Sequence, residues 1–149
     1  MATRPADPPA GTTFAPLRPE HLAALTLQPA QAHLAGTLAN PGLAGDLLIL
    51  GPAWSVLADG RPVACGGCFR ALGPPVIAWA LLSPDAGRLM PRLTRAVRRF
   101  LDLEGSAETG VEWGHAEGAR WARLLGFRPT GRPVERWACP EKPLELWER

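Results

Sequence analysis

The clearest pattern of hydrophobic and polar positions along the chain predicts an amphipathic helix over residues 89–103. At about 100° per residue, one side of this helix is apolar and the opposite side is a row of arginines. The apolar side consists of Leu89, Leu93, Val97, Phe100 and Leu101, and the arginine row consists of Arg88, Arg92, Arg95 and Arg99. Pro91 is tolerated only in the first turn of a helix, so we expect the helix to begin between residues 88 and 90. Gly105 is its expected end.

A second amphipathic segment, residues 111–127, predicts a short strand, a turn, a helix and a glycine stop. Apolar or small residues recur at the helical spacing i, i+3, i+4 and i+7, at Gly118, Trp121, Ala122 and Leu125. Gly126 falls where a helix needs a residue of left-handed conformation, and the next residue, Phe127, then returns to the core.

The middle of the chain predicts strands. Asp59-Gly60 lies between two apolar runs and predicts a β-hairpin over residues 54–65, because both turn residues tolerate positive φ. Gly66-Gly67 in its second strand indicates a bulge or a close backbone approach. The fully apolar run 76–82 predicts a central strand that is covered on both faces.

The remaining segments complete an alternating order. Residues 1–13 are rich in Pro, Ala and Thr without periodicity, so we expect a flexible tail. A short strand at 14–17, helices beginning near 18 and 29, and strands at 109–113, 132–138 and 144–147 are further expectations, each from a short local pattern. The resulting order is β, α, α, β, β, β, α, β, α, β, β, which predicts one α/β (α+β) domain over residues 14–149.

One segment resembles a known superfamily. Residues 120–127, Arg-Trp-Ala-Arg-Leu-Leu-Gly-Phe, resemble the C-terminal half of a GNAT N-acetyltransferase, which often has a helix ending in Leu-Gly-Phe. The Arg120-Trp121 pair is similar, more narrowly, to GNAT-like proteins of tailed phages and prophages, either internal virion proteins or acetyltransferases. The element order agrees with this superfamily. The resemblance implies a mixed, mostly antiparallel twisted sheet of six to seven strands, with about four helices on both faces.

The resemblance also implies a cofactor site. In GNAT enzymes acetyl-CoA lies where the strand before the third helix opens a gap in the sheet, and its pyrophosphate rests on amides at that helix's N-terminus. Helix N-termini attract anions in general. Carried over to this chain, the resemblance implies cofactor contacts at the end of the apolar strand and in the following loop, at Leu81, Leu82, Ser83, Gly87, Arg88 and Arg92.

This loop departs from the superfamily motif Gln/Arg-x-x-Gly-x-Gly/Ala. It has one glycine, Asp85 would repel phosphate, and Pro91 lacks an amide donor. Two interpretations of Arg88 and Arg92 stay open. Their side chains could bind phosphate directly, or they could belong to the solvated face of the helix, as Arg95 and Arg99 further along it indicate.

Transfer of an acyl group to an amine needs a base, acting directly or through water. The candidates are Glu112, on the strand beside the expected gap, and His115, where GNAT proteins often have an Asn. A histidine at this place could relay a proton, or it could be a turn residue or a helix cap. Many GNAT enzymes use as general acid a Tyr four residues before the glycine of Leu-Gly-Phe. That position is Ala122 here, and the chain contains no Tyr.

Cys65 and Cys68 have the Cys-x-x-Cys spacing of zinc or redox sites. An odd spacing of three sends their side chains to opposite faces of a regular strand, unless a bulge at the glycines brings them together. We therefore expect buried small-residue packing and no metal site.

Composition narrows the function classes. The length of 149 residues and the 46% hydrophobic content fit one globular domain, and a net charge of +2 does not favour a nucleic-acid partner. No apolar run approaches the roughly 20 residues of a membrane span. Three cysteines, an odd number, favour a reducing cytoplasm over a disulfide framework. Of the six tryptophans, we expect Trp54, Trp79, Trp113 and Trp121 in the core, and Trp137 and Trp147 on a surface that pairs a homodimer.

Two functional hypotheses follow. The first is an acyl-CoA-dependent N-acyltransferase that transfers an acetyl group from acetyl-CoA to an unknown amine. The second is a catalytically inactive GNAT-like phage or prophage structural or interaction protein, which the altered loop and the missing Tyr favour. The enzyme predicts an open V between the strands that end at Leu82 and Trp113, with free amides at residues 87–89. The inactive protein predicts that this groove is filled by side chains.

Overall fold

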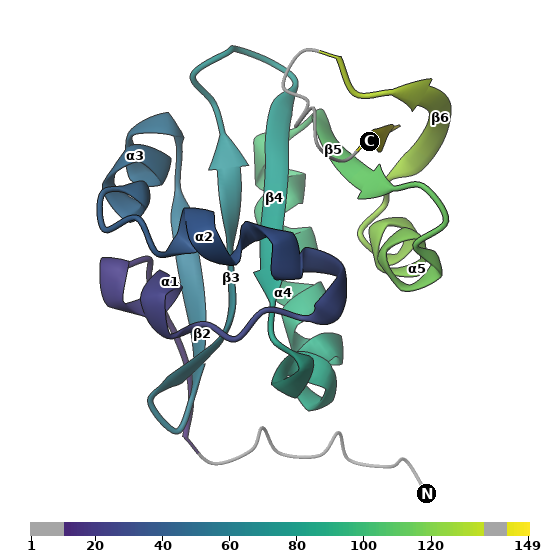
Figure 1. Ribbon diagram of the computed structural model, residues 1–149. Helices are drawn as coiled ribbons and strands as arrows, with labels where there is room; N and C mark the ends of the chain where they lie inside the picture. The colour runs from purple at the N-terminus through teal and green to yellow at the C-terminus, as the bar shows by residue number, and fades with distance from the viewer. Residues whose placement is uncertain (1–10, 136–142) are drawn as a thin grey trace, which may run out of the picture.

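The computed structural model describes residues 11–135 and 143–149 and contains one seven-stranded sheet (Figure 1). The strand order in space is β1-β2-β3-β4-β5-β7-β6, and every neighbouring pair is antiparallel except β4 and β5. The strands are β1 Thr12–Pro16, β2 Ala53–Ala58, β3 Arg61–Phe69, β4 Val76–Leu82, β5 Ala107–Glu112, β6 Arg128–Pro133 and β7 Leu144–Glu148. This confirms the predicted mixed, mostly antiparallel sheet.

Helices cover both faces of the sheet, as predicted. They are α1 Pro19–Ala24, α2 Ala35–Leu38, α3 Leu43–Leu50, α4 Met90–Glu104 and α5 Ala116–Leu124, with 3-10 helices η1 Pro29–Leu34 and η2 Pro84–Leu89. One hydrophobic core joins α4 and α5 to the sheet, and a second core on the opposite face joins α1, α2 and α3 to it. Within the described residues, none of these helices is both long enough and apolar enough to span a bilayer.

The hairpin and the central strand have the predicted form. Asp59 and Gly60 turn the chain between β2 and β3 with φ of 51° and 78°. The glycine pair in β3 marks a close backbone approach, because a Cβ on Gly67 would lie 2.3 Å from the carbonyl oxygen of Pro52. The one register shift of this hairpin lies between Val56 and Leu57 instead. Strand β4 has the predicted bounds and is the central strand of the seven.

Both predicted amphipathic helices are confirmed, together with their glycine stops. Helix α4 begins at Met90 and buries Leu93, Val97 and Leu101, and Gly105 after it has a φ of 81°. Helix α5 is followed by Gly126 with a φ of 94°, after which Phe127 enters the core. Glycine is favoured at both stops because other residues are strained at positive φ.

Some boundaries and elements differ from the predictions. Strand β1 begins at Thr12, within the segment predicted as a tail, whose residues 1–10 lie outside the described part of the chain. Helix α3 was not predicted, because its sequence is apolar on nearly all sides and has no periodicity. Strand β6 begins at residue 128 rather than 132, and residues 136–138 of the predicted strand lie outside the described residues.

Two tryptophan predictions were wrong. Trp113 is 46% exposed although we expected it in the core, and Trp147 is 2% exposed although we expected it on a dimer surface. For Trp147 the physical reason is that β7 inserts between β5 and β6 and is not an edge strand, so its side chain enters the core. Trp113 was predicted within a strand but follows the last residue of β5. Trp137 lies outside the described residues, and the homodimer stays a prediction.

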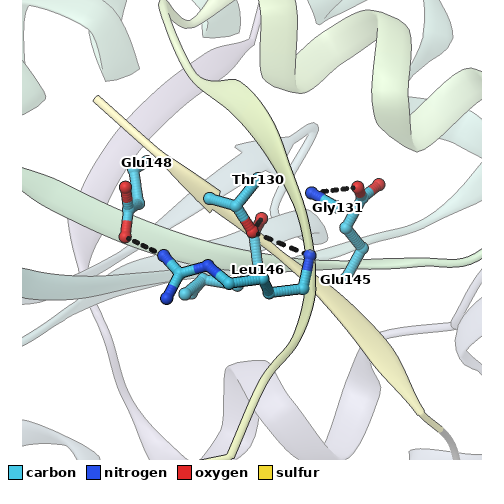
Figure 2. A network of polar contacts seen from close by, with 6 residues as sticks. Thr130, Gly131, Glu145, Leu146 and Glu148 are labelled. Carbon is cyan, nitrogen blue, oxygen red and sulfur yellow. Dashed lines mark hydrogen bonds and ion pairs between the residues drawn. The ribbon is translucent and has the colours of Figure 1, made fainter.

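Side-chain bonds supplement the pairing of the edge strand β6 with β7 (Figure 2). Its pairing shifts register between Pro129 and Pro133, two residues that have no amide to donate to a ladder. In this interval the Thr130 hydroxyl donates to the carbonyl of Leu146 at 2.7 Å, and the Gly131 amide donates to the Glu145 carboxylate at 3.0 Å. Proline residues on an edge strand reduce the number of amides with which a further strand could pair.

Candidate functional site

The parallel strands β4 and β5 pair only at their beginnings. The paired residues are Val76 with Ala107 and Ile77 with Glu108, after which the strands diverge (Figure 1). If this register continued, Leu81 would lie opposite Glu112. Both strands end on the same side of the sheet because they are parallel, and such carboxyl ends are where open α/β sheets bind ligands. The separation predicted for this place in the sheet is therefore present.

The chain's own groups cover the backbone edge of β4 in this separation. The Thr109 hydroxyl donates to the carbonyl of Ala78 at 2.8 Å. The carboxamide of Gln31 donates from Nε2 to the carbonyl of Ala80 at 2.8 Å and accepts through Oε1 from the amide of Leu82 at 2.9 Å.

The Gln31 side chain takes the place of a residue in the parallel β4–β5 ladder. In a parallel ladder, a residue opposite Leu81 would donate to the carbonyl of residue 80 and accept from the amide of residue 82. The Gln31 side chain makes both of these bonds in place of the Glu112 backbone. The neighbouring Gln28 amide donates to the Leu82 carbonyl at 2.8 Å. These contacts were not predicted from the sequence, since no local pattern marks Gln31 or Gln28.

The loop after β4 uses its first amides internally. Ser83 is buried at the N-cap position of η2, where its hydroxyl accepts from the Asp85 amide at 3.2 Å and its carbonyl accepts from the Ala86 amide at 3.0 Å. Gly87 lies inside this 3-10 helix with open space where a Cβ would be, so no close approach requires a glycine there. Residues 87–89, whose amides we expected to be free in an enzyme, lie within this 3-10 helix.

Of the two predicted phosphate-binding arginines, the contacts place Arg92 away from the gap. Its guanidinium lies 5.4 Å from the ring centroid of Phe14, which belongs to the edge strand β1, three positions from β4 in the sheet. Arg88 is exposed in the last turn of η2, close in sequence to the end of β4. Arg88 is thus the better placed of the two for an anion near the β4 end.

The candidate bases lie at the end of β5. Glu112 is half-buried and is the last residue of the strand, opposite Leu144 of β7. His115 occupies the N-cap position of α5 without a side-chain capping bond, and its ring lies against the first turn, where a Cβ on Gly118 would be 2.5 Å from Nδ1. His115 therefore packs on its own helix, whereas Glu112 lies on the strand that separates from β4.

A hollow of about 200 Å³ adjoins the end of β4. It is lined by Ser83 and Asp85 of the loop, by Arg61 and its neighbours in the β2–β3 hairpin, and by Ala24 and Thr26 at the end of α1 and after it. Its volume is below the range of roughly 300–1,000 Å³ that is usual for small-molecule sites. In this conformation the hollow accommodates a fragment and not a whole cofactor.

The two cysteines of the Cys-x-x-Cys spacing lie on opposite faces of β3, as the odd spacing predicted. Cys65 faces α1, where its Sγ lies 3.5 Å from Ser55 Oγ, which in turn is 2.9 Å from His21 Nδ1. Cys68 faces the core formed with α4. No group of three or more potential metal ligands occurs within residues 11–135 and 143–149.

The Cys68 thiol gives a pH-dependent prediction. Burial, together with the nearby Glu104 carboxylate, raises the pKa of Cys68 to about 11. An unfolded thiol has a pKa near 8.5, so between these values the unfolded chain loses a proton that the folded chain keeps. The free energy of unfolding should therefore fall with rising pH, by up to roughly 1.4 kcal/mol per unit from this residue. Urea unfolding at pH 7.5 and pH 10 should show a smaller decrease for Cys68→Ala than for the wild type, and equal decreases would contradict this.

Comparison with solved structures identifies the fold. No protein-family model and no curated protein matches the sequence. Similar structures include an acetyltransferase from Streptococcus agalactiae (TM-score 0.70, 14% identity, 94% of this chain and 98% of that one) and Ard1 from Thermoplasma volcanium (0.70, 14%, 94% and 97%). Another is AAC(6')-Ib in complex with ribostamycin and coenzyme A (0.64, 15%, 93% and 93%). The chain therefore has the fold of the GNAT N-acetyltransferases over nearly its whole length.

Proposed function

We propose that the protein is an acyl-CoA-dependent N-acyltransferase that transfers an acetyl group from acetyl-CoA to a small-molecule amine. The observation that carries this proposal is the separation of β4 and β5 after two paired residues, with Glu112 at the carboxyl end of β5. The GNAT-fold protein AAC(6')-Ib holds coenzyme A together with ribostamycin, which supports the choice of donor and of acceptor class.

The proposed chemistry needs few groups. The amine nitrogen attacks the thioester carbonyl carbon, the carbon–sulfur bond breaks, and coenzyme A leaves as a thiolate. Glu112 removes the proton of the amine, directly or through water, and His115 is the second candidate for this role. Since Ala122 stands where a Tyr acid is common in the superfamily and the chain has no Tyr, the thiolate takes its proton from water.

A titration calorimetry experiment with acetyl-CoA tests the proposal. We expect a Kd in the micromolar range for the wild type, and a Kd about tenfold higher for Arg88→Ala, because a guanidinium near the β4 end binds phosphate by charge-assisted hydrogen bonds. Arg99→Ala is the matched control, because Arg99 is also exposed but lies three turns further along α4. Its Kd should equal that of the wild type. The absence of both binding heat and a thermal shift at millimolar acetyl-CoA would contradict the proposed acyltransferase activity.

A second candidate function rests on backbone groups of the site that already have hydrogen-bond partners within the chain. The Ser83 contacts to the amides of η2, together with Gln31 on β4, favour a GNAT-fold interaction protein that does not bind acyl-CoA. The resemblance of Arg120-Trp121 to phage and prophage proteins is the support for placing such a protein in a virion or prophage. The same calorimetric titration separates the two candidates.

A further inference from the structure

The two bonds from the Gln31 side chain to β4 form the Gln31 clasp. They occupy backbone groups on the edge of β4 with which a ligand between β4 and β5 would bond. The clasp consists of Gln31 Nε2 to the Ala80 carbonyl and of the Leu82 amide to Gln31 Oε1. An amide proton donates well to a single acceptor, so a second acceptor at Leu82 has to replace Gln31. The arm of an acyl-CoA carries two amide groups of the same chemistry as the Gln31 carboxamide.

Gln31 belongs to a segment that has no buried residue, the six-residue 3-10 helix η1, and its own side chain is half-buried. A rotation of this side chain frees the Ala80 and Leu82 groups and leaves the Gln28–Leu82 backbone bond in place. A ligand amide can then make the same two bonds. Two hydrogen bonds within the chain are thereby replaced by two hydrogen bonds to the ligand.

We propose that Gln31 is a displaceable occupant of the acyl-CoA site and thereby lowers the affinity of the protein for its donor. This inference rests on the proposed function. The open-edge form is a fraction of the free protein, and the apparent affinity is reduced by that fraction. Removal of the Gln31 carboxamide abolishes the competition and tightens acyl-CoA binding.

The test compares acetyl-CoA binding by calorimetry in the wild type, Gln31→Ala and Gln31→Met. Gln31→Met keeps the length of the side chain without its amide, which protects the test if the alanine variant fails to fold. We expect a Kd about tenfold lower in both variants. Gln28→Ala is the matched control, because Gln28 contacts β4 through its backbone amide, and its Kd should stay at the wild-type value.

A second measurement reports on the clasp without any ligand. Amide hydrogen exchange at Leu82, followed by NMR, should be at least about tenfold faster in Gln31→Met than in the wild type, because the acceptor of this amide is gone. The amide of Trp79, on the β3 side of β4, is the internal control and should be unchanged.

The outcomes separate this inference from the proposed function. Tighter binding in the Gln31 variants, or binding in them alone, supports both. If the wild type binds acetyl-CoA and the Gln31 variants bind it equally or more weakly, the inference about Gln31 is wrong and the proposed function is still supported. If no variant binds acetyl-CoA at millimolar concentration, the proposed function and the clasp as a donor-site occupant both fail. Unchanged Leu82 exchange in Gln31→Met overturns the clasp whatever the titration gives.

Discussion

Replacing Trp147 by alanine is expected to lower the free energy of unfolding by about 3–5 kcal/mol. The indole ring is 2% exposed and belongs to the core that joins α4 and α5 to the sheet. The Arg123 guanidinium lies 5.1 Å from the centroid of this ring, and the indole Nε1 donates to the Glu145 carboxylate at 3.1 Å. Alanine would leave a cavity at the place where β7 joins β5 to β6, so the loss combines transfer and cavity energies.

Trp113→Ala is the matched control for this substitution. The Trp113 side chain is 46% exposed after the end of β5, so we expect its removal to cost less than about 1 kcal/mol. Urea unfolding at two protein concentrations measures both variants. Similar losses for Trp147→Ala and Trp113→Ala would contradict the assignment of Trp147 to the core. If Trp147→Ala lowers the free energy of unfolding only at the higher protein concentration, Trp147 lies on a dimer surface as first predicted.

The two tryptophans show which features of the fold can be predicted from a local sequence pattern. The hairpin turn at Asp59-Gly60, the Pro91 limit on α4 and the stop at Gly126 depend on backbone conformations of a few adjacent residues, and all three were predicted. The burial of Trp147 depends on which strands flank β7, and no local pattern contains that information. Helix α3 was missed for a related reason, since its apolar sequence lacks the periodicity that distinguishes a helix from a strand.

The candidate site divides in the same way. Local patterns predicted strands β4 and β5, and the resemblance of residues 120–127 to GNAT proteins implied a cofactor site where these strands end. The Gln31 contacts join residues 49 and 51 positions apart in the sequence, and the stacking of Arg92 on Phe14 joins two more distant elements. Side-chain contacts of this range follow from packing and not from periodicity, so they became visible only in the folded structure.

Gly67→Ala is expected to destabilise the protein by about 3 kcal/mol, at the upper end of the usual cost of overpacking. A Cβ at this position would lie 2.3 Å from the Pro52 carbonyl oxygen and 2.9 Å from the Ala53 Cα, both of which are backbone atoms. The backbone of β3 has little freedom to move, because Gly67 is paired with Ala53 of β2 on one side and with Trp79 of β4 on the other. The Pro52 carbonyl also accepts the Cys68 amide at 3.1 Å, and a shift of Pro52 would weaken this bond.

Gly45→Ala is the control for the same chemical change without the crowding. Gly45 lies within α3 and a Cβ there would meet nothing within 4 Å, so alanine should be neutral or should stabilise the helix by up to about 1 kcal/mol. Chemical denaturation of both variants provides the comparison. Equal stabilities of Gly67→Ala and the wild type would show that β2 and β3 can separate at this point. The position of β4, and with it the Gln31 contacts, would then be less rigid than the close approach at Gly67 implies.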